Sequence, residues 1–95
     1  MKKPNGNFFP VDHRITETDR FRRLEDGAIR LYLFLCKIQN RFGDWQGDFE
    51  AGDRWVSEVA GMARMTMRKY RNQLIEAGFV TCECKRTRTK YHLSA

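Results

Sequence analysis

The sequence predicts an α+β fold, with three main helices, a short N-terminal helix before them, and a C-terminal β-hairpin with a short third strand. Three observations predict it. Apolar residues recur at the three-and-four spacing of buried helix faces in the segments 27–41 and 64–77. Gly61 and Gly78 stand where helical segments are expected to end. Past Gly78 the apolar period changes to alternation, which is typical of a β-strand.

We expect residues 1–15 to form an N-terminal arm and residues 16–95 to form the folded domain. The first seven residues are polar, and Phe8 and Phe9 then place two aromatic side chains next to each other. We expect this piece to be extended and to tuck its aromatic rings onto the domain. Residues 16–24 follow with the spacing of a short helix.

Residues 27–41 predict the longest helix, with Asp26 as its N-cap. The segment is apolar nearly all round, and Arg30 and Lys37 are among its few interruptions. A stripe this wide exceeds what one packed neighbour covers. We favour a central core helix covered on several sides. The second interpretation is a core helix whose spare edge joins another copy in a homodimer.

Residues 40–53 are rich in turns, with glycine at three positions. Trp45 and Phe49 lie between these turns and are expected to anchor a short strand around residues 46–50. The glycines are Gly43, Gly47 and Gly52.

The next stretch predicts two helices joined by a sharp turn. The first covers residues 54–60, with Asp53 as its N-cap, and Gly61 ends it because glycine adopts the left-handed conformation without a Cβ penalty. The second covers residues 64–77 and is closed by Gly78. Its inward stripe is expected to be Met67, Tyr70, Leu74 and Ala77.

The opposite face of the second helix is polar and basic. Arginine can donate two hydrogen bonds to guanine, asparagine can bond adenine in the same way, and lysine contacts phosphates. A merely solvated face usually mixes both charge signs, whereas the only acid on this helix is Glu76. These residue types predict contact with duplex DNA through Arg64, Met65, Thr66, Arg68, Lys69 and Asn72.

After Gly78 the alternation predicts a β-hairpin. Val80, Cys82 and Cys84 are expected to face the core from its first strand, and Tyr91 and Leu93 from its second. The loop between them is basic and would lie along a phosphate backbone or enter the minor groove. Its candidate DNA-binding residues are Lys85, Arg86, Arg88 and Lys90.

The net charge of +6 is placed unevenly along the chain. Residues 1–63 hold ten basic and ten acidic residues, whereas residues 64–95 hold eight basic and two acidic ones. Solubility would be served as well by scattered charge. A polyanionic partner explains the segregation directly, because counterions released from phosphates supply most non-specific affinity.

Together these features resemble the winged helix-turn-helix class. Small Ser57, then Gly61 and the apolar anchors Met67 and Tyr70, resemble the helix-turn-helix pattern, although Ala63 stands where Ser or Thr usually caps the second helix. The segments GAIRLYLFLCKIQNRFGDW and AGDRWVSEVAGMARMTMRKYRNQLIEAGFV, with a wing ending KYHLS, look most similar to the N-terminal DNA-binding domains of phage and plasmid replication initiators or replisome organisers.

The resemblance implies sequence-specific binding of double-stranded DNA in replication initiation, with helix 64–77 in the major groove and the basic wing 85–90 on the backbone. Two alternatives stay open. One is a transcriptional regulator of the winged-helix type. The other is a protein-interaction winged helix without DNA binding, docked on a replisome or transcription partner through Met62, Met65 and the aromatic arm. Such domains usually begin longer chains, so the sequence is either a front part of that kind or a small protein on its own.

Other function classes fit poorly. Cys36, Cys82, Cys84 and His92 raise zinc as an option, but no paired Cys-x-x-Cys exists and His92 is expected to face outward, so we expect no metal. The chain has two histidines and neither a nucleophile elbow nor a phosphate-cradling glycine loop, so we expect no enzyme activity and no cofactor.

Three further features of the sequence indicate the compartment. No apolar run approaches a membrane span, and the opening MKKPNG has no apolar region of a secretory signal. Three cysteines, an odd number, favour free thiols over a disulfide framework. We therefore expect a cytoplasmic protein.

Overall fold

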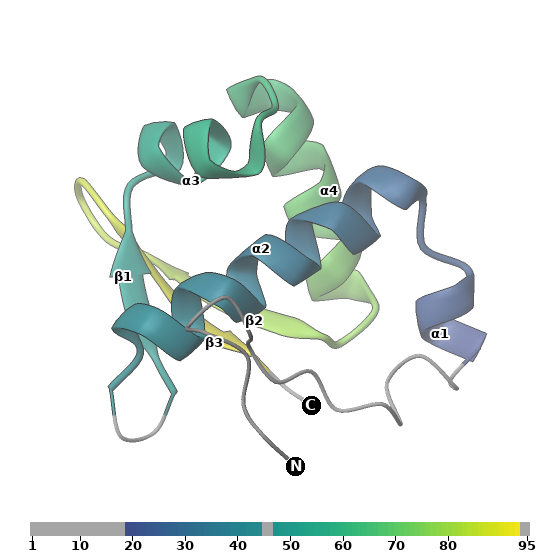
Figure 1. The fold of residues 1–95 in the computed structure, drawn as a ribbon, viewed down its shortest axis with the longest axis horizontal. Helices are drawn as coiled ribbons and strands as arrows, with labels where there is room; N and C mark the ends of the chain where they lie inside the picture. The colour runs from purple at the N-terminus through teal and green to yellow at the C-terminus, as the bar shows by residue number, and fades with distance from the viewer. Residues whose placement is uncertain (1–18, 45–46, 94–95) are drawn as a thin grey trace, which may run out of the picture.

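The computed structural model describes residues 19–44 and 47–93 and has an α+β architecture (Figure 1). The predicted arm of residues 1–15 and the predicted anchor Trp45 lie outside these ranges. Within them, no helix is both long and apolar enough to cross a membrane. The elements in chain order are α1 (Asp19–Arg22), α2 (Asp26–Phe42), β1 (Phe49–Ala51), α3 (Asp53–Ala60), α4 (Arg64–Glu76), β2 (Val80–Cys84) and β3 (Thr89–Leu93).

The three strands form one antiparallel sheet in the order β1-β3-β2. β3 is central, and its Tyr91 is opposite Phe49 of β1 and Cys82 of β2. The Phe49 and Tyr91 rings stack with centroids 5.1 Å apart. The short third strand expected around residues 46–50 therefore exists, but it is shifted to residues 49–51.

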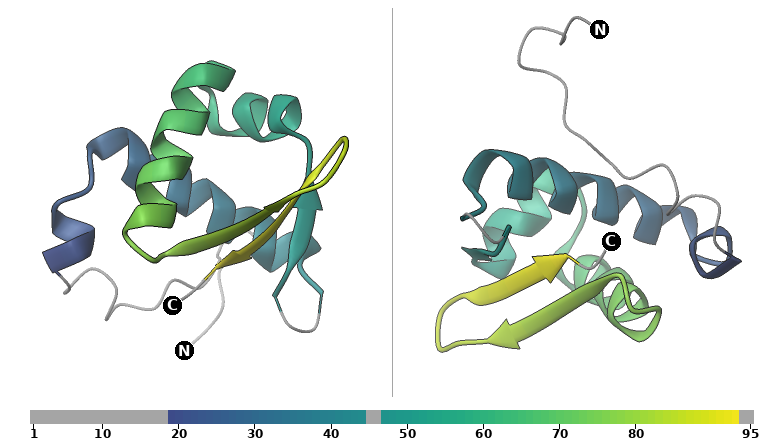
Figure 2. Two further views of the ribbon diagram at one scale, coloured as in Figure 1. Left: turned by 180° about the vertical axis from the view of Figure 1, so that it is seen from behind. Right: turned by 90° about the horizontal axis from the view of Figure 1, so that it is seen from below.

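The core lies between α2 and the sheet, with α4 closing it. Leu31 and Leu35 of α2, Met67 and Leu74 of α4 and Tyr91 of β3 are fully buried. α2 lies on one side of the molecule, and α4 with the β2–β3 hairpin lies on the other (Figure 2). The prediction that the longest helix is a core helix is thus confirmed by its buried residues, which are Ala28, Leu31, Tyr32, Leu35, Cys36 and Ile38.

Two glycines end the helices of the α3–α4 pair, as predicted. Gly61 has φ of 68° and Gly78 has φ of 84°. After α3, the N–H groups of Gly61 and Met62 donate to the carbonyls of Glu58 and Ser57. The same pattern follows α4, so both ends are Schellman motifs, which satisfy the last carbonyls of each helix.

Two predicted N-caps are wrong. Asp26 is the first residue of α2 and Glu25 precedes it as N-cap, without a side-chain capping bond. Asp53 is likewise the first residue of α3, after Gly52 as N-cap. The physical reason at Asp53 is competition: its carboxylate bonds two arginine side chains of α4 instead of the backbone N–H groups of its own helix.

The predicted inward set of β2 is correct only at its beginning. Val80 is buried, Cys82 is partly buried and Cys84 is exposed. The alternation of the strand persists, since Thr81 and Glu83 are exposed, but the burial of the inward positions falls along the strand toward the loop. Tyr91 and Leu93 of β3 are buried as predicted.

Candidate nucleic-acid interface

α4 presents its basic face to solvent. All six residues predicted there are exposed, and Met65 is the most exposed large apolar residue of the described chain, at 83%. They are exposed because Met67 and Leu74 turn the opposite face of the helix into the core. The exposed residues are Arg64, Met65, Thr66, Arg68, Lys69 and Asn72.

One carboxylate organises the flank of α4 that faces α3. Arg68 donates from Nε to Asp53 Oδ2 at 2.9 Å, and Arg71 donates from Nη1 to Asp53 Oδ1 at 2.8 Å. Arg71 Nη1 also donates to the Tyr91 hydroxyl at 2.9 Å. The single Asp53 side chain thus joins the start of α3 to two turns of α4, and Arg71 continues the link to β3.

Arg71 is buried, at 8% exposure, although it is one of the eight basic residues in the segment 64–95. A signal was present in the sequence. Arg71 stands four residues after Met67 and three before Leu74, so it continues the buried stripe of α4. A charged residue in such a stripe needs a buried partner, and Asp53 supplies it.

This network keeps Asp53 ionised. The hydrogen bond from Arg71, together with the bond from Arg68, lowers the pKa of the Asp53 carboxyl below its ordinary value. Burial raises the pKa of the Tyr91 hydroxyl, so this group stays protonated at neutral pH. Arg68 uses Nε for the carboxylate, and a guanidinium held by this edge keeps its two Nη groups for a ligand.

The other flank of α4 meets the start of α2. Lys69 Nζ lies 3.8 Å from Glu25 Oε2, and Gln73 donates to the same oxygen. Both Lys69 and Glu25 are more than half exposed, so this ion pair contributes little to stability and could exchange for a phosphate.

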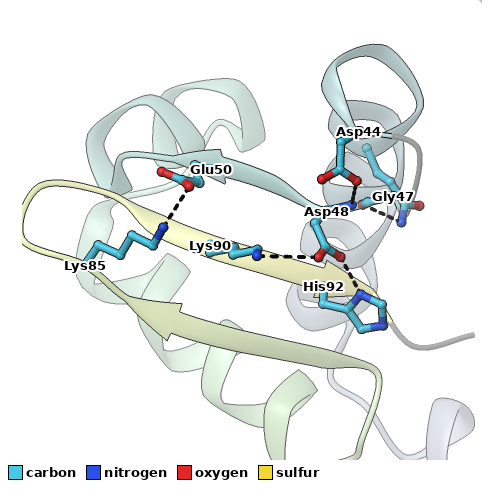
Figure 3. Close-up of polar contacts among 8 residues, drawn as sticks. Asp44, Gly47, Asp48, Glu50, Lys85, Lys90 and His92 are labelled. Carbon is cyan, nitrogen blue, oxygen red and sulfur yellow. Dashed lines mark hydrogen bonds and ion pairs between the residues drawn. The ribbon is translucent and has the colours of Figure 1, made fainter.

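Figure 3 shows how acidic residues of β1 and the preceding turn hold the hairpin cations. Lys85 Nζ is 2.9 Å from Glu50, and Lys90 Nζ is 3.8 Å from Asp48, which also contacts His92. These groups share the outer face of the sheet, opposite the buried Tyr91 and Leu93. Two of the four predicted hairpin cations are therefore already paired.

Arg86 and Arg88 are different. Both are exposed in the hairpin loop, and neither forms an ion pair with any residue in the ranges 19–44 and 47–93. The loop also lies near the Asp53 network, because a Cβ at Gly52 would be 3.7 Å from the carbonyl oxygen of Thr87. Gly52 precedes Asp53, which binds Arg68, so the middle of α4 and the hairpin loop approach each other around the start of α3.

The cysteines are not gathered for metal binding. Burial raises the pKa of the Cys36 and Cys82 thiols to about 11, which disfavours the thiolate that a metal requires. Throughout the part of the chain that is described, no three Cys, His, Asp or Glu residues cluster in a way that could hold a metal ion.

Comparison with known proteins gives no match, whether with family models, with curated proteins or with solved structures.

Proposed function

We propose that the chain is a winged helix-turn-helix domain that binds duplex DNA with sequence specificity. The element order α2-β1-α3-α4-β2-β3 and the short antiparallel sheet are compatible with that fold. α3 and α4 form its helix-turn-helix, α4 enters the major groove, and the loop of residues 85–88 follows the adjacent backbone.

One observation supports this proposal above the others. The exposed face of α4 and the hairpin loop that carries the exposed Arg86 and Arg88 approach each other around Asp53 and Gly52. A surface built from a helix and a basic loop side by side matches a groove and its flanking phosphates.

We place the domain in phage- or plasmid-type replication initiation, on the resemblance of its sequence. Transcriptional regulation by the same surface is the alternative. A third possibility is a protein-interaction domain without DNA binding, for which the 83% exposure of Met65 is the supporting observation.

Duplex binding is tested by measuring fluorescence anisotropy of a labelled duplex over a range of salt concentrations. We expect binding at low salt with micromolar protein and a steep loss of affinity as salt rises. Replacing Arg86 and Arg88 together with alanine should reduce the salt slope by about 2, one unit for each lost phosphate contact.

Lys37→Ala is the matched control for this experiment, because Lys37 is an exposed cation of α2, and this helix lies on the other side of the molecule from α4 (Figure 2). It should leave the salt slope within error of wild type. Absence of any binding at low salt would overturn the DNA proposal, as would equal effects of the control and the loop variant.

We also propose that the exposed edge of α2 forms a homodimer. An open groove of about 510 Å³ lies there, and Leu33 is 39% exposed. The groove is lined by Asp26, Ile29, Arg30, Leu33, Phe34 and Lys37. In an antiparallel pair of α2 helices, Asp26 of one copy would face Lys37 of the other. Because α2 lies opposite α4 and the hairpin, the two copies would present their DNA surfaces on opposite sides and bridge two duplex segments.

Sedimentation velocity over a concentration series checks the dimer. Leu33→Glu should convert it to a monomer while leaving the affinity for a short duplex unchanged. A wild-type chain that sediments as a monomer at every concentration would contradict the proposal.

A further inference from the structure

A second groove, of about 360 Å³, lies beside the hairpin loop. The end of α2, β1, the start of α3 and the loop all contribute to it, through side chains that include Phe42, Glu50, Trp55 and Arg88. Its volume is near the lower end for small-ligand sites. Its two aromatic residues come from different helices, Phe42 from α2 and Trp55 from α3, so only the tertiary structure brings them together.

The two aromatic rings of this groove are exposed rather than packed in the core. Phe42 is 58% exposed and Trp55 is 41% exposed. Their centroids are 5.8 Å apart with an interplanar angle of 74°. An edge-to-face pair holds both rings in place yet leaves a ring face open to solvent, which is the geometry that a stacking ligand needs.

The charge around the rings is positive. Arg88 lines the groove, and the Arg41 guanidinium lies 5.6 Å from the centroid of the Phe42 ring. Glu50 is the acidic group of the lining, and Lys85 neutralises it at 2.9 Å. A ligand that fits should therefore combine a flat face with negative charge, and a nucleotide of a polynucleotide chain has both.

We propose that this groove binds an unpaired nucleotide of single-stranded DNA, whose base stacks on Trp55 or Phe42 and whose phosphate is bound by Arg88 and Arg41. An apolar segment of a protein partner would cover the rings but would offer no phosphate to Arg88 or Arg41. Gly52, also in the lining, has no side chain that would keep a base away.

The site deepens the proposed function, on which its position beside duplex DNA depends. Arg88 belongs to the loop that we place on the duplex backbone and also to the groove. A strand that separates from the duplex at the loop would therefore enter the groove directly. The domain would then hold a junction between paired and unpaired DNA, as an initiator at an opening duplex requires.

The test uses tryptophan fluorescence. The chain has two tryptophans, so Trp45→Phe leaves Trp55 as the sole reporter. Titration of this variant with oligo-dT should quench its fluorescence. Anisotropy titrations with labelled DNA then compare the affinities for three ligands: oligo-dT, a duplex with a single-stranded overhang, and the blunt duplex. They are done both with the Trp45→Phe variant and with the chain that keeps Trp45.

Trp55→Leu should weaken binding of oligo-dT about tenfold. It should also weaken binding of the overhang duplex and leave the affinity for the blunt duplex unchanged. Trp55→Phe should keep most of the oligo-dT affinity, since a ring remains, and Phe42→Leu should weaken it. Ile75→Ala is the matched control: it also removes an exposed apolar side chain, and it should leave oligo-dT binding unchanged. Far-UV circular dichroism confirms that each variant is folded.

The other possible outcomes would each contradict one of the two proposals. No quenching of Trp55 by oligo-dT at low salt would overturn the inference and favour a protein partner for the groove. Equal losses for oligo-dT and blunt duplex in Trp55→Leu would also overturn it, because the ring would then serve the duplex surface. Quenching by oligo-dT without any binding of blunt duplex would support the groove and contradict the proposed duplex function.

Discussion

Replacing Arg71 with methionine is expected to lower the free energy of unfolding by about 2–3 kcal/mol, a fall in Tm of roughly 10–20 °C for a domain of this size. Methionine occupies similar volume but donates no hydrogen bond. The Asp53 carboxylate, whose side chain is 20% exposed, would lose its shorter bond, and the buried Tyr91 hydroxyl would lose its donor. Thermal unfolding followed by circular dichroism measures the change.

Arg68→Met is the control for this prediction, because both arginines bind the same carboxylate. The Arg68 side chain is 53% exposed, so its loss should cost under about 1 kcal/mol. Equal losses in the two variants would show that burial does not decide the strength of these pairs.

The Arg71 effect should also depend on pH. The folded chain holds the pKa of Asp53 below its ordinary value, so the pair contributes fully above the unfolded pKa of about 4 and is lost as pH falls through the folded value. The stability difference between wild type and Arg71→Met should therefore narrow at acid pH. A difference that widens on acidification would contradict this assignment.

The second large effect concerns recognition of DNA. Arg68→Lys is expected to weaken binding to a selected duplex site by about 10–100-fold, because lysine cannot donate the paired bonds that a guanidinium gives to guanine. The charge is kept, so affinity for random duplex should change far less. Selection of bound oligonucleotides from a random pool supplies the site, and anisotropy titrations supply both affinities.

Asp53→Asn should lower the ratio of the affinity for the selected site to the affinity for random duplex. The reason is that the neutral amide holds the Arg68 guanidinium less firmly. Arg86→Lys is the matched control: in a loop that contacts phosphates, lysine replaces arginine with little effect on either duplex. If Arg68→Lys left the ratio unchanged, or if Arg86→Lys lowered it as much, the assignment of base reading to α4 would be wrong.

Local patterns in the sequence predicted most of the described fold. Gly61 and Gly78 ended their helices as expected, because only local φ and backbone bonding decide a Schellman motif. The alternation after Gly78 placed Tyr91 and Leu93 in the core for the same kind of reason. The predicted cap at Asp53 was wrong because its carboxylate bonds Arg68 and Arg71 instead, and the one at Asp26 was wrong because α2 begins one residue earlier than predicted.

The sequence by itself therefore determined the element order, the exposed basic face of α4 and the basic hairpin loop, since these follow from residue periodicity and composition. Only the tertiary structure decided which of the candidate DNA-binding cations form no ion pair within the described residues. It paired Lys85 with Glu50 and Lys90 with Asp48, and it buried Arg71 against Asp53. It also brought Phe42 and Trp55 together at the surface. Such contacts join segments distant in the chain, and their distances are set by packing of the core rather than by local periodicity.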